Sequence, residues 1–227
     1  MGGGFFLDWW TPIRNIPVLL QSCGLSLMFM LVGFGFEVVF GAIFGYIRYT
    51  QKGPLYPIIT AYVEIIRNTP LLVQLLLFYF GLPQLGIPTT PFQTGFIGLI
   101  VYGTAYGTEI YRGGIQSIDK GQWEAGEVLG MSKIRIFIDI IFPQTLRTVF
   151  PTLTNESVYM LYATALLSAV SVEELMGKTK YIAGSTFRTL EMYITCLILY
   201  YLMASLIAFV MRKINLKYFP SVSSVGA

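Results

Sequence analysis

Long apolar stretches, separated by shorter polar segments, follow one another along the 227 residues of this chain. A helix needs about 20 apolar residues to cross the hydrocarbon core of a bilayer, and five of the stretches are long enough. These expected spans cover roughly residues 18–47, 58–81, 92–112, 145–172 and 190–211. The pattern predicts an all-α, polytopic membrane protein in which residues 1–227 form a single transmembrane domain.

Small and polar residues interrupt two of these spans. The first span carries Gly33, Gly35, Gly41 and Gly45. Small residues let helices approach each other closely in a membrane, so we expect this span to pack tightly against a neighbour. The fourth span is the most broken one, because it contains Pro151 and the polar pair Asn155 and Glu156.

Composition favours a membrane protein over a soluble one. Charged residues make up 12% of the chain, whereas soluble domains carry about 25%. Lipid-facing surface needs no charge, so a bilayer accounts for the deficit. The net charge of +3 is too small to indicate nucleic-acid binding. The chain has no histidine, and Cys23 and Cys196 lie in apolar stretches, which argues against a metal site, a disulfide framework and hydrolytic catalysis.

The basic residues predict an orientation in the membrane. Most of the 15 fall between spans one and two, between spans three and four, or after span five. They are Arg48, Lys52, Arg112, Lys120, Lys133, Arg135, Arg147, Arg212, Lys213 and Lys217. Because loops rich in lysine and arginine stay in the cytoplasm, we expect the N-terminus outside the cell and the C-terminus in the cytoplasm.

The segment between spans three and four, roughly residues 119–143, is too polar and too patterned to be a plain connector. Ser132 is placed to cap a helix, and the isoleucines that follow it give this helix an apolar side. We expect a short amphipathic helix at the membrane surface that presents Glu124, Ala125 and Gly126 to a cytoplasmic partner.

The spacing inside this segment is regular. Glu124-Ala125-Gly126 is followed by three residues, Gly130, nine residues, Ile140, one residue and Phe142-Pro143. This resembles the EAA loop of bacterial ABC importer permeases, with Gly126 and Phe142 as mild departures. The resemblance implies a helix–turn–helix that docks in a groove on an ATPase subunit, in which Gly130 permits the turn and Pro143 ends the loop. The alternative is an incidental Glu-Ala-Gly sequence in an ordinary loop.

Three further segments extend the resemblance over most of residues 20–215. Residues 62–74, 106–122 and 155–166 resemble the second span, the lead-in to the EAA loop and the fourth span of the polar amino-acid permeases, the histidine, glutamine and arginine importers. The resemblance implies a type I ABC importer permease of the bacterial inner membrane. Its implied partners are two cytoplasmic ATPase subunits, a second permease that is identical or homologous, and an extracytoplasmic amino-acid-binding protein. ATP and Mg²⁺ then belong to the ATPase, and this chain indeed contains no Gly-x-x-x-x-Gly-Lys-Ser/Thr motif.

Glu156 is the first candidate for binding the substrate, because charged groups within a membrane are costly. Its carboxylate would pair with the positively charged side chain of an amino acid. The other residues expected at the site are Asn155, Thr104, Tyr162 and Thr164. The structural alternative is that Arg67 or Arg147 satisfies Glu156. Relatives often carry a lysine and an acid where residues 161–166 read Leu-Tyr-Ala-Thr-Ala-Leu, so this chain could also be the non-binding half of a heterodimer.

Other polar residues of the spans have less defined roles. Tyr102 and Tyr106 could line the same cavity, although packing between helices is the favoured interpretation. Glu37 lies deep in the first span, and both an intersubunit contact and a polar cavity remain open for it.

Two pairs of polar residues are expected to be structural. Glu64 and Arg67, three residues apart, are expected to pair with each other on one face of a helix. Glu173 and Glu174 could face outside and meet the binding protein, but a solvated loop is the favoured interpretation.

Two other classes of protein were weighed. A secondary transporter that works without ATP would be indicated by internal repeats, and no repeat between the two halves is visible. A membrane enzyme would need a cluster such as His/Asp/Glu or Ser/Lys, which the sequence does not display. The pattern therefore favours a transport subunit over an enzyme.

Overall fold

The computed structural model describes residues 7–218, and every regular element in that range is helical. The α-helices are α1 (Trp10–Thr50), α2 (Leu55–Arg67), α3 (Leu71–Gln84), α4 (Pro91–Gln116), α5 (Lys120–Val128), α6 (Lys133–Ile136), α7 (Phe142–Thr164), α8 (Leu175–Thr186) and α9 (Thr189–Tyr218). A π-helical segment, Phe137–Ile141, joins α6 to α7, and a 3-10 segment, Ala165–Val170, follows α7. The predicted all-α class is confirmed.

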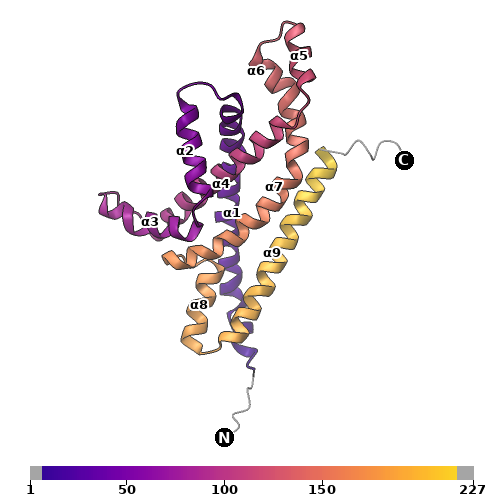
Figure 1. Ribbon diagram of the computed structural model, residues 1–227. Coiled ribbons are helices and arrows are strands. Elements are labelled where there is room, and N and C mark those ends of the chain that lie inside the picture. The colour runs from indigo at the N-terminus through magenta and orange to yellow at the C-terminus, as the bar shows by residue number, and fades with distance from the viewer. Residues whose placement is uncertain (1–6, 219–227) are drawn as a thin grey trace.

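Helix α1 runs along the length of the bundle (Figure 1). Its 41 residues extend about 60 Å at about 1.5 Å per residue, twice the thickness of a hydrocarbon core of about 30 Å. It begins before the expected span because Asp8 accepts hydrogen bonds from the Trp10 backbone N–H (3.0 Å) and the Thr11 hydroxyl (2.9 Å). The same bonds, that from Thr11 above all, lower the pKa of Asp8. α1 therefore tilts in the membrane or extends beyond it.

Helices α1 and α4 lie in close backbone contact. A Cβ atom added to Gly41 of α1 would lie 2.8 Å from the carbonyl carbon of Gly107, and one added to Gly107 of α4 would lie 2.5 Å from the carbonyl oxygen of Glu37. Only residues without a side chain fit at such separations, so the two backbones touch here. The tight packing expected from the glycines of the first span is present, and α4 is the neighbour.

The second expected span is not one straight helix. α2 and α3 meet at an angle of 108°, with Asn68, Thr69 and Pro70 between them. Pro70 has no backbone N–H and disfavours helical conformation in the preceding residue, so the helix ends here. The side-chain amide of Gln74 donates to the backbone carbonyl oxygens of Ile66 (2.9 Å) and Thr69 (3.1 Å), which fixes the bend.

The prediction that Pro143 ends the cytoplasmic loop is wrong. The π-helical segment carries the chain from α6 directly into α7, so the helical run is continuous from Lys133 to Val170. Pro143 falls within the first turn of α7. Proline is well tolerated at this position in helices, although it has no backbone N–H to donate. Pro151 also lies inside α7 without breaking it.

Within residues 7–218, two helices, α1 and α9, are long and apolar enough to cross a membrane by length and composition. The count rises to four if each bent pair is one span, namely α2 with α3 and the run Lys133–Val170 with α8, which meet at 47°. α4 has 26 residues, but its glycines, threonines and tyrosines keep it from reaching the same apolar character. The chain is a multi-pass helical membrane protein, and α4 corresponds to the third predicted span, residues 92–112, which is the one of the five predicted spans that this count leaves out.

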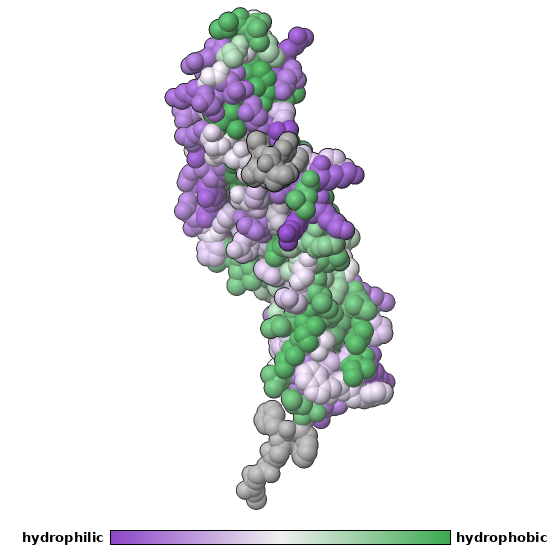
Figure 2. All heavy atoms as spheres, turned by 90° about the vertical axis from the view of Figure 1, so that its right-hand side faces the viewer, coloured by the Kyte–Doolittle hydropathy of each residue, from purple (hydrophilic) through white to green (hydrophobic). Residues whose placement is uncertain are grey.

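The surface is consistent with this arrangement. Figure 2 shows hydrophobic side chains gathered over the lower part of the visible face and more hydrophilic ones toward the upper part, near α5 and α6. Exposed apolar residues such as Leu197, Leu202 and Phe209 lie along α9. Such a wide apolar surface suits contact with lipid.

Glu174 is not in a solvated loop, which corrects that expectation, whereas Glu173 beside it is exposed. The carboxylate of Glu174 accepts hydrogen bonds from the Tyr200 hydroxyl (2.7 Å), the Ser26 hydroxyl (3.1 Å) and two backbone N–H groups that begin α8. It is therefore a buried helix cap that ties α1, α8 and α9 together, since buried polar groups need such partners.

Candidate functional site

Helices α5 and α6 form a helix–turn–helix at one end of the bundle, which we call the coupling hairpin (residues 119–136) (Figure 1). Asp119 caps α5 by accepting from the Gly121 N–H (2.6 Å), and Ser132 caps α6 by accepting from the Arg135 N–H (3.4 Å). Gly130 has a φ of +73°, so the turn needs a residue that tolerates this conformation. The expected capping role of Ser132 and turning role of Gly130 are confirmed.

The three residues of the Glu-Ala-Gly sequence do not share one surface. Glu124 and Ala125 are exposed, whereas Gly126 is buried against α6, and a Cβ atom added to it would lie 2.7 Å from Cγ1 of Ile136. This corrects the expectation that Gly126 faces a partner. Its lack of a side chain instead allows the two arms of the hairpin to pack against each other.

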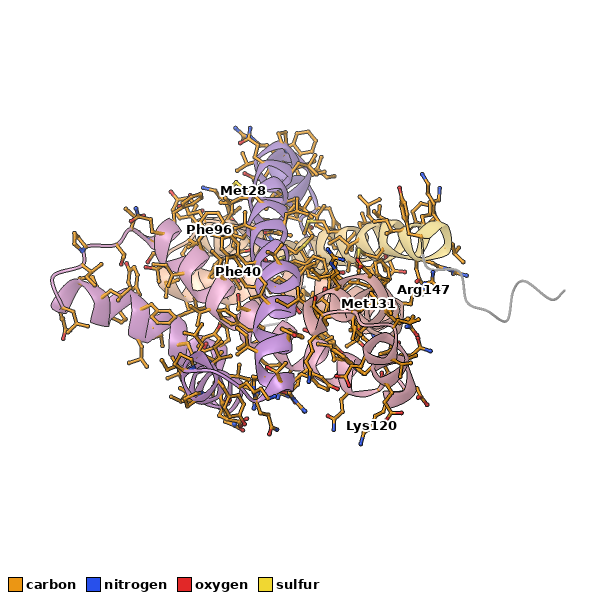
Figure 3. All side chains as sticks on the ribbon, turned by 90° about the horizontal axis from the view of Figure 1, so that it is seen from above. Met28, Phe40, Phe96, Lys120, Met131 and Arg147 are labelled. Atoms are coloured by element: carbon orange, nitrogen blue, oxygen red, sulfur yellow. The ribbon has the colours of Figure 1, made fainter. Side chains whose placement is uncertain are left out.

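The tip of the coupling hairpin carries apolar side chains that sequence reasoning missed. Val128 is 88% exposed and Leu129 is 77% exposed, and these two residues directly precede Gly130. Apolar residues beside a turn glycine were the signal that could have found them. Seen from above, Lys120 points away from the bundle and Met131 lies closer in (Figure 3). An exposed apolar tip of this kind is typical of a surface that another protein covers.

Aromatic contacts fasten the coupling hairpin to the end of α1. Tyr49 stacks on Trp123 with ring centroids 5.9 Å apart, and Tyr46 lies 4.1 Å from Phe137. These contacts connect the hairpin to α1, and the contact of Gly41 with Gly107 connects α1 to α4.

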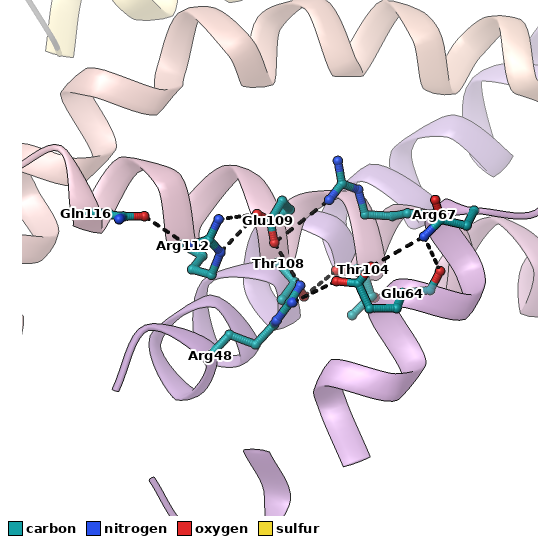
Figure 4. Close-up of polar contacts among 9 residues, drawn as sticks. Arg48, Glu64, Arg67, Thr104, Thr108, Glu109, Arg112 and Gln116 are labelled. Carbon is teal, nitrogen blue, oxygen red and sulfur yellow. Dashed lines mark hydrogen bonds and ion pairs between the residues drawn. The ribbon is translucent and has the colours of Figure 1, made fainter. Parts of the chain in front are cut away.

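An ion-pair network joins α1, α2 and α4 (Figure 4). Glu109 is its centre, because its carboxylate pairs with Arg48 (2.8 Å), with Arg112, and more distantly with Arg67 (3.9 Å). Arg48 also pairs with Glu64 (2.9 Å). The three arginines around Glu109 stabilise its ionised carboxylate. The expected pair between Glu64 and Arg67 is wrong, since each has a different partner.

Replacing Glu109 with glutamine is expected to lower the free energy of unfolding by about 2 kcal/mol or more, because Arg48 is then left as a nearly buried charge with one partner fewer. The measurement is thermal unfolding of the purified protein in detergent. Glu127→Gln is the matched control, because Glu127 forms only an exposed pair with Lys133 and its loss is expected to cost below about 0.5 kcal/mol. Equal shifts for the two variants would contradict the central role of Glu109.

Glu156 lies on α7, partly buried, within electrostatic range of Arg67 of α2 and Glu37 of α1. Among the described residues, neither Arg67 nor Arg147 forms an ion pair or a hydrogen bond with Glu156, so the alternative that one of them satisfies its carboxylate is not met in this structure. Glu37 is fully buried against α4, and neither of its carboxylate oxygens has a hydrogen-bond partner among the described residues. The burial of Glu37 in the bundle excludes an intersubunit contact for it.

The other expected site residues are distributed over different surfaces. Asn155 and Tyr162 are exposed and lie on one face of α7, since they are seven residues apart. Thr164 is buried on the opposite side of α7, and its hydroxyl donates to the Leu161 carbonyl (2.7 Å). Thr104 lines an apolar groove of about 240 Å³ between α1, α2 and α4. The substrate-binding role of all five residues remains a prediction.

The geometry of the bundle and the coupling hairpin indicates a class of protein. A helical membrane bundle holds acidic and basic residues in its interior, and an exposed hairpin at one end is mechanically fastened to the central helices. This is the arrangement of a membrane transport domain that is driven from the side of the hairpin. No group of three or more histidine, cysteine, aspartate or glutamate residues suited to a metal ion occurs within residues 7–218.

The chain belongs to the family of binding-protein-dependent transport system inner membrane components, whose model matches residues 37–218. It is therefore a transport subunit of an ABC system and not an enzyme. Among curated relatives, a putative glutamine transport system permease protein of Rickettsia bellii is 33% identical, over 89% of this chain and 94% of the relative. An arginine transport system permease protein of Bacillus subtilis is 28% identical, over 93% of this chain and 97% of the relative.

Solved structures agree with the family assignment. The crystal structure of an amino acid ABC transporter with histidines has a TM-score of 0.85 to this chain, with 30% identity over 94% of this chain and 100% of the other. An inward-facing methionine ABC transporter has a TM-score of 0.76 with 20% identity over 88% of this chain and 96% of the other, which shows a shared fold. The predicted type I importer permease fold is thereby confirmed.

Proposed function

We propose that the chain moves a polar, positively charged L-amino acid into the cytoplasm as the permease subunit of an ATP-driven importer. The observation that carries this proposal is Glu156, an acidic residue within the helical bundle that is partly exposed and has no hydrogen bond or ion pair of its own at direct contact distance among the described residues. A carboxylate in such a setting favours a guanidinium or ammonium group. Relatives named for arginine and for glutamine support an amino-acid substrate.

The proposal includes the orientation of the chain in the membrane, with the hairpin end in the cytoplasm. The coupling hairpin, the end of α1 and the end of α9 lie toward one end of the molecule, and the N-terminal end of α1 lies at the other (Figure 1). The hairpin end carries Lys52, Lys133 and Arg212, which supports a cytoplasmic location for it. The N-terminus then lies outside the cell.

The partners are proposed from the family. Two ATPase subunits that bind ATP and Mg²⁺ would receive the coupling hairpins of this chain and of a second permease. An extracytoplasmic binding protein would deliver the amino acid at the opposite end. Closure of the ATPase pair would draw the hairpins together, and the contacts of Trp123 with Tyr49 would carry that movement to α1.

Uptake by the reconstituted transporter tests the substrate. Glu156→Gln is expected to reduce ATP-dependent arginine uptake about tenfold and to change glutamine uptake less than about twofold, because the variant loses a charge-assisted contact with the cation. Asp139→Asn serves as the control, since Asp139 is an exposed carboxylate on the same helical run.

The same experiment separates the alternatives. Equal losses of arginine and glutamine uptake in Glu156→Gln would refute a role in selectivity. No loss at all would favour the non-binding half of a heterodimer. Uptake that persists without the ATPase would favour a secondary transporter.

A further inference from the structure

We propose that a basic pocket between the ends of α1 and α4 and the start of α5 binds the phosphate group of an anionic phospholipid. The pocket has a volume of about 200 Å³. Its lining includes the basic residues Arg48, Arg112 and Lys120 and the amides Gln51 and Gln116, and no acidic residue of the described chain. The proposal concerns contact with the membrane and goes beyond the transport function proposed above.

The ion-pair network behind the pocket holds more positive than negative charge. Its arginines are Arg48, Arg67 and Arg112, and its carboxylates are Glu64 and Glu109. Figure 4 shows Arg48 and Arg112 reaching Glu109 from α1 and from α4. Because one carboxylate is shared by the arginines of the pocket, an anion that enters the pocket meets positive charge that the protein does not fully neutralise.

Arg112 retains N–H groups that could bind such an anion. Its Nε donates to Glu109 (2.9 Å), its Nη1 donates to Gln116 (2.9 Å), and its Nη2 also donates to Glu109. A guanidinium carries more N–H groups than these bonds use, and its fork matches the oxygens of a phosphate. The side chain is only partly buried, so the remaining donors are accessible from the pocket.

Lys120 adds a positive charge without a partner. It is the first residue of α5 and is exposed, and it forms no hydrogen bond or ion pair with another residue in the range 7–218. Asp119, its neighbour in sequence, is engaged in capping α5 through the Gly121 N–H (2.6 Å). In the view from above, Lys120 lies at the edge of the molecule (Figure 3). Its ammonium group is therefore free to bind a ligand from outside the chain.

The pocket lies where the apolar surface of α1 ends. Phe40 and Ile43 are exposed apolar residues of α1, and Arg48 follows Ile43 after about 8 Å along the helix axis. Tyr46 and Tyr49 flank Arg48 in the sequence. Tyrosine together with arginine at the end of an apolar helix is typical of the headgroup layer of a membrane. The phosphates of phospholipids lie in this layer, and basic pockets between helices on the cytoplasmic side suit anionic headgroups.

A lipid fits this place better than a free anion. A volume of about 200 Å³ exceeds that of a few water molecules, at about 30 Å³ each, so it admits a headgroup. Tyr49 and Ile118 add apolar wall to the pocket. The acyl chains of a lipid also keep its phosphate at the mouth of the pocket, which raises its effective concentration. A bound headgroup would join α1, α4 and α5, and would thus stabilise the attachment of the coupling hairpin.

Mass spectrometry of the intact transporter tests the proposal. The complex of this chain with its ATPase subunits is purified in a non-ionic detergent and receives equal amounts of phosphatidylglycerol and phosphatidylcholine with the same acyl chains. The masses of the intact complexes count the molecules of each lipid that stay bound. Phosphatidylglycerol is expected to bind about fivefold more tightly or better, because its headgroup alone carries a net negative charge.

Variants of the pocket locate the binding. Lys120→Gln is expected to weaken phosphatidylglycerol binding about fivefold, whereas Lys120→Arg keeps the charge and is expected to stay within about twofold of the wild type. Arg112→Gln is expected to weaken binding as well. Because Arg112→Gln also removes bonds to Glu109, Lys120→Gln decides the question if Arg112→Gln does not fold. Arg212→Gln is the matched control, since Arg212 is an exposed basic residue of α9 outside the pocket, and is expected to change binding less than about twofold.

Four results would overturn the proposal. Equal binding of the two lipids would show that the headgroup is not recognised. An unchanged affinity in Lys120→Gln, or an equal loss in Arg212→Gln, would show that the pocket is not the place of binding. Displacement of the lipid by an equal concentration of glycerol phosphate would show that the pocket takes a soluble anion. A preference that the chain alone displays but the complex lacks would show that the ATPase, and not a lipid, covers the pocket.

Discussion

Replacing Gly126 with leucine is expected to reduce ATP-driven uptake to background while the chain still inserts in the membrane. A Cβ atom at this position would already lie 2.7 Å from Cγ1 and 2.9 Å from Cδ1 of Ile136, so a leucine must push α5 away from α6. The coupling hairpin then presents Glu124, Val128 and Leu129 in the wrong place for an ATPase groove. The measurement is ATP-dependent uptake into proteoliposomes, together with co-purification of the ATPase.

Gly24→Leu is the matched control for this variant. Gly24 is an exposed glycine of α1, and nothing lies within 4 Å of a Cβ added there, so the same substitution should leave uptake within about twofold. Normal uptake in Gly126→Leu, or normal ATPase binding together with lost uptake, would show that the packing of the hairpin is not what couples it to the ATPase.

More of the fold than of the candidate site could be predicted from the sequence. Apolar stretches locate α1, α9 and most of α7, because lipid and a buried core both require them. The bend before α3 could have been predicted, since Asn68-Thr69-Pro70 interrupts an apolar run. The continuous helix through Pro143 could not be predicted. A proline near the start of a helix and a proline that ends a loop look alike in a sequence.

The partners of charged groups were harder to predict than the groups themselves. Glu64 and Arg67 stand three residues apart, and that spacing alone suggested a pair. The preference of Glu64 for Arg48 and of Arg67 for Glu109 depends on how α1, α2 and α4 cross, which no local spacing contains. Glu174 was misjudged for the same reason, because its hydroxyl partners Ser26 and Tyr200 come from distant helices.

Replacing Gly107 with valine is expected to prevent α1 and α4 from packing and to lower the free energy of unfolding by about 3 kcal/mol or more. A Cβ atom there would lie 2.5 Å from the Glu37 carbonyl oxygen and 2.8 Å from its Cγ, and Gly41 faces Gly107 across the same contact. Because backbone atoms on both sides leave no flexible group to move aside, the helices must separate, and overpacking of this kind is destabilising.

Thermal unfolding and size-exclusion chromatography in detergent measure this effect, and Gly113→Val is the control on the same helix. Gly113 is exposed, and a Cβ there has nothing within 4 Å, so valine at Gly113 brings the same change in helix propensity without the clash. The difference between the two variants isolates the contact of α4 with α1. The buried Glu37 lies at this contact, and its carboxylate has no hydrogen-bond partner in residues 7–218. Similar stability for both variants would contradict the tight contact and would mean that α1 and α4 pack more loosely around Glu37.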